Sequence, residues 1–412
     1  MSGFSNLPST TWGIFFVTLV VNIGNYMTPF MSIFLSSKLG LSPETTGIFV
    51  SIAGMAFLPG SLIGGKLADV WGKKQVFILF QTLAAITTLV NAFVLDAFIS
   101  PCLFVVNAMF VAATIPVYNS TIFDVSDESN LKASLSLFFV GMNVGNLFSS
   151  FIGSIMFSKH YQLLFCIEAV LKVVSIVIFF LFVNYHGAKA QLKSNSTCKD
   201  DEDKMEKASL FGVLLKKPIL ILFSVSCVFF SIVLSQNNYA LPLHLNSVFG
   251  NEVGTKYYGI VLGINAFTII VMTGLIARFT SNWNKLDLVL IASIIICVGF
   301  GMLYFGNALW VYAVSTVLWS IADILNTPNS SAYFAEYAPP SMRGRFAAWI
   351  KIVTGAGYAI GPVCIGYVIE NYGTRVTWPI LAILAVICGI LLCFVRTLDK
   401  KAKQINKNNL NP

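Results

Sequence analysis

Residues 64–74 read Gly64-Gly65-Lys66-Leu67-Ala68-Asp69-Val70-Trp71-Gly72-Lys73-Lys74, and they separate two long apolar runs. Glycine lets a chain turn sharply and lets helix backbones approach closely. An acid near a helix end can accept hydrogen bonds from free amides or pair with a basic group, and lysines mark the cytoplasmic side of a membrane. The stretch therefore predicts a tight turn between two helices at a membrane surface.

The composition is that of a membrane protein. Of 412 residues, 56% are hydrophobic and only 11% are charged, which leaves too little polar surface to cover a soluble globule of this size. The formal charge of +8 comes from basic residues between apolar runs, which is a topology signal and not a nucleic-acid footprint. The eight cysteines form no C-x-x-C pair. We expect a bilayer protein that binds no nucleic acid, cofactor or metal.

Apolar runs long enough to span a bilayer, about 20 residues each, recur along the whole chain. We predict twelve spans, at residues 12–36, 45–66, 75–95, 100–123, 133–157, 162–184, 218–242, 255–279, 286–306, 308–336, 346–370 and 375–396. The predicted fold class is an all-α membrane protein with two six-helix bundles, 1–184 and 218–396. A charged cytoplasmic linker at 185–217 joins the bundles, and a cytoplasmic tail follows at 397–412.

The basic residues predict the orientation. Of the 26 lysines and arginines, four fall on one side of the predicted spans (Lys38, Lys159, Lys256 and Arg375), and Lys172 lies inside a span. The others fall on the opposite side, which also holds both termini and the linker. We therefore expect a multi-pass protein of the cell membrane with both termini in the cytoplasm.

The two halves of the chain repeat each other weakly, as is common in transporters. The matches at a shift of 212 residues are Gly47 with Gly259, Lys66 with Arg278, Trp71 with Trp283, Lys73 with Lys285, Pro116 with Pro328, Asp124 with Glu336 and Gly145 with Gly357. At a shift of 213, Asn25, Tyr26 and Pro29 match Asn238, Tyr239 and Pro242. These matches indicate a duplicated helical unit.

Residues 64–74 resemble the signature loop of the major facilitator superfamily, G-x-L-A-D-r-x-G-r-k, which joins its helices 2 and 3. The positions that fit are Gly65, Leu67, Ala68, Asp69, Gly72, Lys73 and Lys74, whereas Val70 stands where a basic residue is usual. The run from Gly357 to Pro362 is similar to the family's G-x-x-x-G-P motif. The resemblance implies a transporter that works by alternating access and is not an enzyme.

Two features depart from the drug/proton antiporters of that family. Asn146 stands where the proline of their helix 5 motif belongs, and residues 107–123 contain no basic residue, although the antiporters carry an arginine there. Antiport is therefore not implied by the resemblance alone.

Polar residues inside four predicted spans mark a candidate substrate cavity, because buried polar groups in lipid are costly and usually face a cavity. Their helical spacing puts them on common faces, and the resemblance implies that these four helices line the cavity. They are Asn22, Asn25 and Tyr26; Asn107, Thr114 and Tyr118; Gln236, Asn237, Asn238 and Tyr239; and Trp319 and Asn326. For each amide, a helix-to-helix hydrogen bond is the alternative.

Two acids inside the spans are candidates for proton coupling. Asp323 lies deep in the span at 308–336, where a charged carboxylate is costly, so it could carry a proton or cation or make a structural hydrogen bond. Glu168 lies one turn from Lys172, and these two charges can neutralise each other. Lys351 is expected to extend to the cytoplasmic surface.

Charged residues at the cytoplasmic ends of the spans are candidates for a gate. We expect Asp124 to lie near Lys132, and Glu336 to lie near Arg343 and Arg345 as its counterpart in the second half. These charges could pair when the cavity closes to the cytoplasm, or they could merely set the topology.

The sequence contains no P-loop that would bind ATP, so we predict a secondary transporter. We also expect the protein to be a monomer. The first interpretation is proton-coupled export of a small drug-like compound or metabolite, and the second is proton-coupled uptake of a polar nutrient. A membrane sensor or scaffold that transports nothing is the alternative from another class. Its partners would be the small-molecule substrate, protons and the lipid bilayer.

Overall fold

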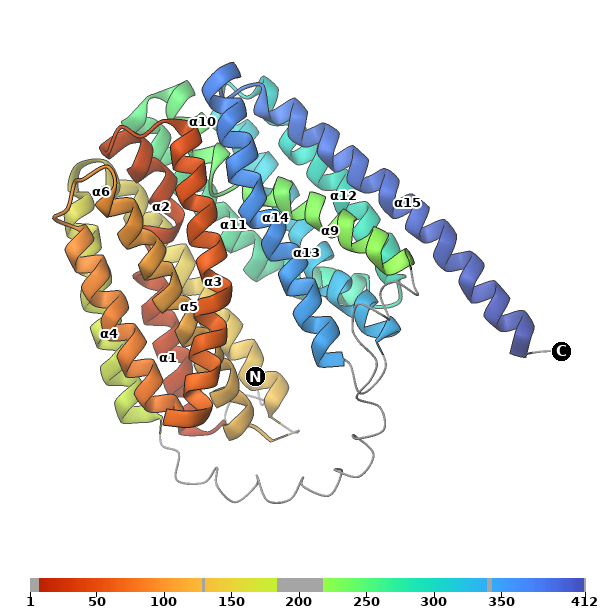
Figure 1. The fold of residues 1–412 in the computed structure, drawn as a ribbon, viewed down its shortest axis with the longest axis horizontal. Helices are drawn as coiled ribbons and strands as arrows, with labels where there is room; N and C mark the ends of the chain where they lie inside the picture. The colour runs from red at the N-terminus through yellow and green to blue at the C-terminus, as the bar shows by residue number, and fades with distance from the viewer. Residues whose placement is uncertain (1–6, 128–129, 184–217, 339–342, 411–412) are drawn as a thin grey trace. The chain divides into compact units, whose positions relative to one another are not determined.

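The structure, a computed structural model, describes residues 7–127, 130–183, 218–338 and 343–410. Every regular element in these ranges is a helix (Figure 1). The chain forms two compact units, of which the first contains residues 1–196 and 238–270 and the second contains 197–237 and 271–412. The predicted linker at 185–217 lies outside the described residues.

The first unit contains the helices of the first half of the chain, together with α10 and most of α11. Their bounds are α1 Ser9–Ile23, α2 Met27–Ile33, the π-helical η1 Phe34–Lys38, α3 Pro43–Trp71, α4 Lys73–Asn91, α5 Ile99–Val125, α6 Leu131–Phe182, α10 Ala240–Phe249 and α11 Asn251–Phe279. α1 packs against α6, and α5 packs against both α3 and α4 (Figure 1). The rings of Phe77 and Phe179 stack in its core at 4.1 Å between centroids, with Tyr118 against the edge.

The second unit contains the remaining helices and the end of α11. They are α9 Pro218–Ser235, α12 Lys285–Gly301, the 3-10 helix η2 Met302–Phe305, α13 Leu309–Tyr337, α14 Arg343–Tyr372 and α15 Thr377–Leu410. α9 packs against α14 and α15, and α12 packs against α13 and α15. Phe300 stacks between Trp319 and Trp378, at centroid distances of 6.4 and 6.0 Å.

The described helices suit a bilayer. Ten helical segments among them are long and apolar enough to cross a membrane. One of these, in α6, covers the predicted span at 133–157 and the span at 162–184 as far as Phe182, with the non-helical His160 (φ −133°, ψ 39°) between them. α4 covers most of the predicted span at 75–95 but is not among the ten. The structure supports the all-helical membrane fold, while the number twelve stays a prediction.

Many large apolar side chains point away from the protein, among them Leu62, Ile155 and Phe394, which are 66%, 68% and 64% exposed. In water this surface would be unfavourable, whereas lipid tails are as apolar as the side chains. The outer faces of the helices are therefore adapted to hydrocarbon.

The predicted turn within residues 64–74 is a single residue. α3 continues through Trp71 and α4 begins at Lys73, so the chain reverses at Gly72, whose φ of 97° is unfavourable for residues with a Cβ. The helix therefore extends five residues beyond the predicted span end at 66, and Asp69 lies in its last turn.

In the loop between α4 and α5, Asp96 accepts hydrogen bonds from the amides of Phe98 and Ile99, which lowers the pKa of its carboxyl.

Candidate functional site

The first membrane-spanning segment is broken between α1 and α2, and Pro29 explains one half of the break. Proline has no N–H, so in a helix the carbonyl four residues earlier, here that of Asn25, loses its partner. The Ser149 hydroxyl of α6 donates a hydrogen bond to the Asn25 carbonyl at 2.8 Å. A buried side chain thus replaces the helical bond that proline removes.

Glu168 of α6 accepts hydrogen bonds from the backbone amides that follow the break. The backbone N–H groups of Tyr26 and Met27, at the start of α2, donate to its Oε2 at 2.9 and 2.8 Å. The first amides of a helix lack intrahelical acceptors, and a negative charge is favourable at that end of the helix dipole. Glu168 therefore fixes where the second part of the broken helix begins.

Lys172 neutralises this carboxylate, as the four-residue spacing predicts. Its Nζ lies 2.8 Å from Glu168 Oε1, and the two side chains are only 6% and 2% exposed. Lys172 Nζ also donates to Thr88 Oγ1 of α4 at 2.6 Å. Because both Glu168 oxygens accept hydrogen bonds and its charge is matched, these contacts are those of a structural clamp.

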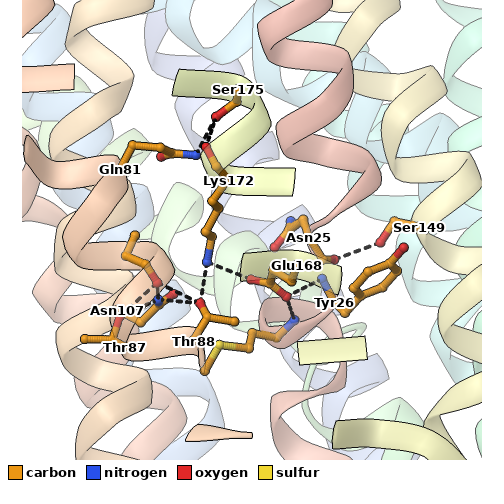
Figure 2. Close-up of polar contacts among 12 residues, drawn as sticks. Asn25, Tyr26, Gln81, Thr87, Thr88, Asn107, Ser149, Glu168, Lys172 and Ser175 are labelled. Carbon is orange, nitrogen blue, oxygen red and sulfur yellow. Dashed lines mark hydrogen bonds and ion pairs between the residues drawn. The ribbon is translucent and has the colours of Figure 1, made fainter. Parts of the chain in front are cut away.

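The network continues from Thr88 across α4 to α5 (Figure 2). Asn107 Nδ2 donates to the Ala84 carbonyl at 2.9 Å and to the hydroxyls of Thr87 and Thr88 at 2.8 and 3.0 Å. Asn107 thus makes the helix-to-helix contacts that were the alternative to a cavity role. The polar groups of α4, α5 and α6 and of the start of α2 form one connected cluster inside the first unit.

The segment between α9 and α10 is broken in the same way. Pro242 deprives the Asn238 carbonyl of its helical partner, and the Ser32 hydroxyl donates to that carbonyl at 3.0 Å. Tyr239 is buried, and its hydroxyl donates to the Pro43 carbonyl at 2.5 Å. The predicted repeat of Asn, Tyr and Pro therefore marks two helix breaks in which serine hydroxyls satisfy the freed carbonyls.

A cavity of about 400 Å³ lies among the helices of the second unit. Its lining residues come from α9, α13 and α14, namely Phe230, Ser231, Leu234, Asp323, Asn326, Thr327, Ser330, Ser331, Ile350, Lys351, Thr354 and Tyr358. Two of the predicted site residues, Asp323 and Asn326, are on this wall.

Asp323 is half-buried, and its Oδ1 accepts a hydrogen bond from Thr327 Oγ1 at 2.7 Å. Within the described ranges, no basic side chain forms an ion pair with it. Lys351 is exposed and lines the same cavity, while its extension to the cytoplasmic surface stays a prediction. The cavity therefore carries one carboxylate and one ammonium group.

The other predicted cavity residues make local contacts or lie in the packed interior. Asn22 Nδ2 bonds the Thr18 carbonyl of its own helix, and the hydroxyls of Thr114 and Tyr118 bond each other at 2.5 Å. Gln236 Nε2 donates to the Ile232 carbonyl, while Asn237 is half-buried. Trp319 is only 1% exposed, and within the described chain its Nε1 makes no hydrogen bond.

The acids Asp124 and Glu336 at the helix ends each form an ion pair with a lysine of a neighbouring helix. Lys73 Nζ lies 2.5 Å from Asp124 Oδ2, and Lys285 Nζ lies 2.6 Å from Glu336 Oε1. The first pair joins the start of α4 to the end of α5, and the second joins the start of α12 to the end of α13. The two pairs thus correspond in the repeat.

Of the basic residues predicted to lie near these acids, only Arg345 has a described side chain. The side chains of Lys132 and Arg343 lie outside the described residues, and Arg345 is exposed without an ion pair in the described part. Lys74 Nζ donates to the Phe180 carbonyl at 3.1 Å and lies over the Phe180 ring.

Two further residues of the predicted turn are placed by α3. Gly65 faces Pro116 of α5, and Asp69 is exposed at the end of its helix. Among the residues described, Asp69 has no hydrogen bond or ion pair, so its partner, a free amide or a basic group, stays a prediction.

Sequence reasoning missed Lys351, Thr354 and Tyr358 as cavity residues. Their spacing of three and four places them on one face of a helix, and this signal was present in the sequence. Which face of α14 turns toward α13 was not, because that depends on the packing of both helices.

The sequence of this chain is similar to those of known proteins. A family model described as Major Facilitator Superfamily matches residues 14–328 and 240–410. The chain is 21% identical over 386 residues to the uncharacterized MFS-type transporter YqjV of Bacillus subtilis (strain 168), covering 90% of this chain and 89% of the relative. It is 20% identical over 399 residues to a Na(+), Li(+), K(+)/H(+) antiporter of Planococcus maritimus, covering 90% and 92%.

Solved structures share the fold. The nucleoside transporter NupG has a TM-score of 0.76 at 16% identity, covering 94% of this chain and 98% of that chain. The POT family transporter PepTSo has a TM-score of 0.74 at 14% identity, covering 96% and 99%. At these identities the likeness concerns the fold alone.

Proposed function

The chain belongs to the Major Facilitator Superfamily of membrane transporters, and from this premise we propose that it exports a small drug-like compound or metabolite in exchange for protons. Asp323 carries the proton in this proposal. The observation that supports it best is a half-buried carboxylate on a cavity wall, with no ion-pair partner among the residues described. Antiport is further supported by the name of the Planococcus relative.

The chemistry of Asp323 suits this role. A carboxylate charge at membrane depth is unfavourable by several kcal/mol unless water, a cation or a proton compensates it. Thr327 donates to one carboxylate oxygen, at 2.7 Å, and no described residue donates to the second oxygen, which can take a proton from the cavity. A side chain that changes charge while the cavity faces one side and then the other couples solute movement to the proton gradient.

Glu168, the second predicted proton site, has a different part in the proposal. Its two oxygens already accept three hydrogen bonds, one of them from the buried Lys172 ammonium. Protonation of Glu168 would leave the Lys172 ammonium without a counter-charge and would break at least one of these hydrogen bonds. We therefore assign Glu168 to the support of the broken first helix.

The gate proposal uses the observed ion pairs. Lys73 with Asp124, and Lys285 with Glu336, tie the ends of neighbouring helices within each unit. We expect these ends, the linker and both termini to lie on the cytoplasmic side.

The test measures proton movement driven by a solute gradient in proteoliposomes that contain the full chain. Liposomes are loaded with one compound from a metabolite and drug panel, diluted into compound-free buffer, and followed with a pH-sensitive dye inside. Antiport predicts that the interior becomes more acidic as the compound leaves, in whichever orientation the protein inserts. Liposomes without protein correct for compounds that cross the lipid unaided.

The same measurement separates the second candidate, proton-coupled uptake of a polar nutrient. The polar and charged residues on the cavity wall favour this alternative. Symport predicts an interior that becomes more alkaline, because solute and proton leave together. Solute flux with no proton movement would contradict both coupled mechanisms, and a sensor that transports nothing would give neither.

A further inference from the structure

The cavity of the second unit carries two opposite charges on different helices. Asp323 extends from α13 and Lys351 from α14, and both line the same space of about 400 Å³. The third helix, α9, contributes Phe230, Ser231 and Leu234, none of which is charged. The remaining titratable group on the wall is the phenol of Tyr358.

The two charges do not neutralise each other. Other opposite charges of this unit pair closely, as Arg396 Nε and Asp287 Oδ1 do at 2.7 Å. Asp323 and Lys351 form no such pair in the described parts of the chain. Among the described residues, Asp323 bonds the uncharged Thr327 hydroxyl, and both charges line the same cavity, so a solute there can contact each of them.

We propose that this cavity binds a small zwitterion, such as an amino acid, with its ammonium at Asp323 and its carboxylate at Lys351. This inference rests on the proposed transport function and names its substrate class. A cavity of this volume falls in the range of small-molecule sites, roughly 300–1,000 Å³. The hydroxyls of Ser231 and Ser330 and the rings of Phe230 and Tyr358 supply polar and apolar contacts for the rest of the solute.

Charge complementarity explains why one class is preferred. A ligand with a single charge pairs with one wall and leaves the other charge desolvated without a partner, which is unfavourable. A neutral ligand leaves both charges without a partner. A zwitterion satisfies both charges and adds no net charge to a site inside the membrane.

The test compares matched ligands on the purified full chain in detergent. The probes are the standard amino acids, and for each one the amine that lacks its carboxylate and the acid that lacks its amine. Binding is read from the rise in melting temperature with ligand concentration, since a ligand of the folded state stabilises it by mass action. At least one amino acid should bind tenfold or more tightly than both of its singly charged analogues.

Two substitutions assign the charges. In Asp323→Asn the advantage of the amino acid over the acid analogue should fall to less than threefold, because the partner of the ammonium is gone. In Lys351→Met the advantage over the amine analogue should fall likewise. Matched controls are Glu252→Gln and Lys256→Met, which remove the same charges from an exposed ion pair of α11 and should leave both ratios unchanged. Size-exclusion profiles and unliganded melting temperatures show that each variant is folded.

Three results would overturn the zwitterion assignment: no amino acid binds, a singly charged analogue binds as tightly, or the ratios persist in both cavity variants. Proton movement with singly charged solutes but not with zwitterions would also remove the assignment while keeping the proposed function. Zwitterion binding that depends on both charges, without proton movement in liposomes, would keep the assignment and remove the proton coupling.

Discussion

Glu168 and Lys172 are buried opposite charges that stabilise the protein only as a pair. Taking two ions out of water is costly, and their mutual attraction repays that cost when further hydrogen bonds complete both groups. Here the amides of Tyr26 and Met27 donate hydrogen bonds to Glu168, and the Thr88 hydroxyl accepts one from Lys172. Removing one partner leaves the other as an unmatched charge in the interior.

We therefore predict that Glu168→Ala and Lys172→Met each destabilise the protein strongly, by about 3–5 kcal/mol. Glu168→Ala should be the worse of the two, since it also removes the acceptor of the Met27 amide. The double variant should lose less stability than the sum of the single losses. Unfolding of purified protein by denaturant in detergent measures all three.

The control for these variants is Glu252→Gln, which removes a carboxylate from an exposed ion pair, 51% exposed on its side chain. It should change stability little, because exposed pairs contribute only about 0–1 kcal/mol. A Glu168→Gln protein that keeps its stability but loses proton coupling would contradict the structural assignment and return Glu168 to the list of proton carriers.

At the scale of elements, the two broken helices follow from one sequence pattern. Pro29 and Pro242 each remove a donor four residues after an asparagine, and a serine hydroxyl supplies a substitute for the freed carbonyl. Asn25 obtains its bond from Ser149, and Asn238 obtains its bond from Ser32. The breaks are therefore stabilised features of the fold.

Ser149→Ala should leave the Asn25 carbonyl buried without a donor and destabilise the protein by about 1–3 kcal/mol. In the background of Pro29→Ala, the new amide at position 29 can bond that carbonyl, so the same serine substitution should cost clearly less. A thermodynamic cycle of the four proteins measures the difference. Equal losses of stability in both backgrounds would show that Pro29 is not the reason why the Asn25 carbonyl needs the Ser149 hydroxyl.

The lysine–acid pairs at the helix ends should matter for transport more than for stability. Their side chains are 17–41% exposed, so the pairs contribute little to folding free energy. We expect Asp124→Asn and Glu336→Gln to slow transport while changing the melting temperature little. The charge-exchanged variant Lys73→Asp with Asp124→Lys should recover part of the rate, and a rate no better than that of Asp124→Asn would contradict a role of the pair itself.

The same elements show how far the sequence could be read. The all-helical membrane fold, the turn within residues 64–74 and the Glu168–Lys172 pair were predictable, because apolar length, glycine and four-residue spacing are local signals. The ion pairs of Asp124 with Lys73 and of Glu336 with Lys285 were not predicted, since nearby basic residues were preferred to lysines that are 51 residues away. The repeat contained the answer, as both members of each pair match at the same shift.

The position of Lys351 was not predictable from spacing. A lysine near a helix end can extend to the surface or face a cavity, and the rotation of α14 against α13 decides between them. For the cavity residues predicted on the first half of the chain, spacing was also insufficient, because Asn107 bonds the neighbouring helix α4 and Thr114 bonds Tyr118 of its own helix.

At the scale of the whole molecule, the proposed topology places the segment at 185–217 in the cytoplasm and the turn at residues 92–98 outside. A protease site inserted after Ser196 should be cut only when protease reaches the cytoplasmic face, as in inverted membrane vesicles. The same site inserted after Leu95 should be cut in intact spheroplasts. The opposite pattern would reverse the orientation derived from the lysines and arginines.

The proposal at this scale is that one carboxylate couples a duplicated helical transporter to the proton gradient. Asp323→Asn keeps the size and hydrogen-bonding capacity of the side chain but cannot exchange a proton. It should therefore separate exchange of solute, which needs only binding and alternating access, from net transport, which also needs proton movement.

The most direct measurement compares these two activities for Asp323→Asn in one preparation of proteoliposomes, with a radiolabelled solute that the wild-type protein transports. We predict that the variant, at solute concentrations high enough to offset the lost ammonium contact, retains exchange of labelled for unlabelled solute and loses accumulation driven by a pH gradient. Accumulation at the wild-type level in the variant would contradict the central claim.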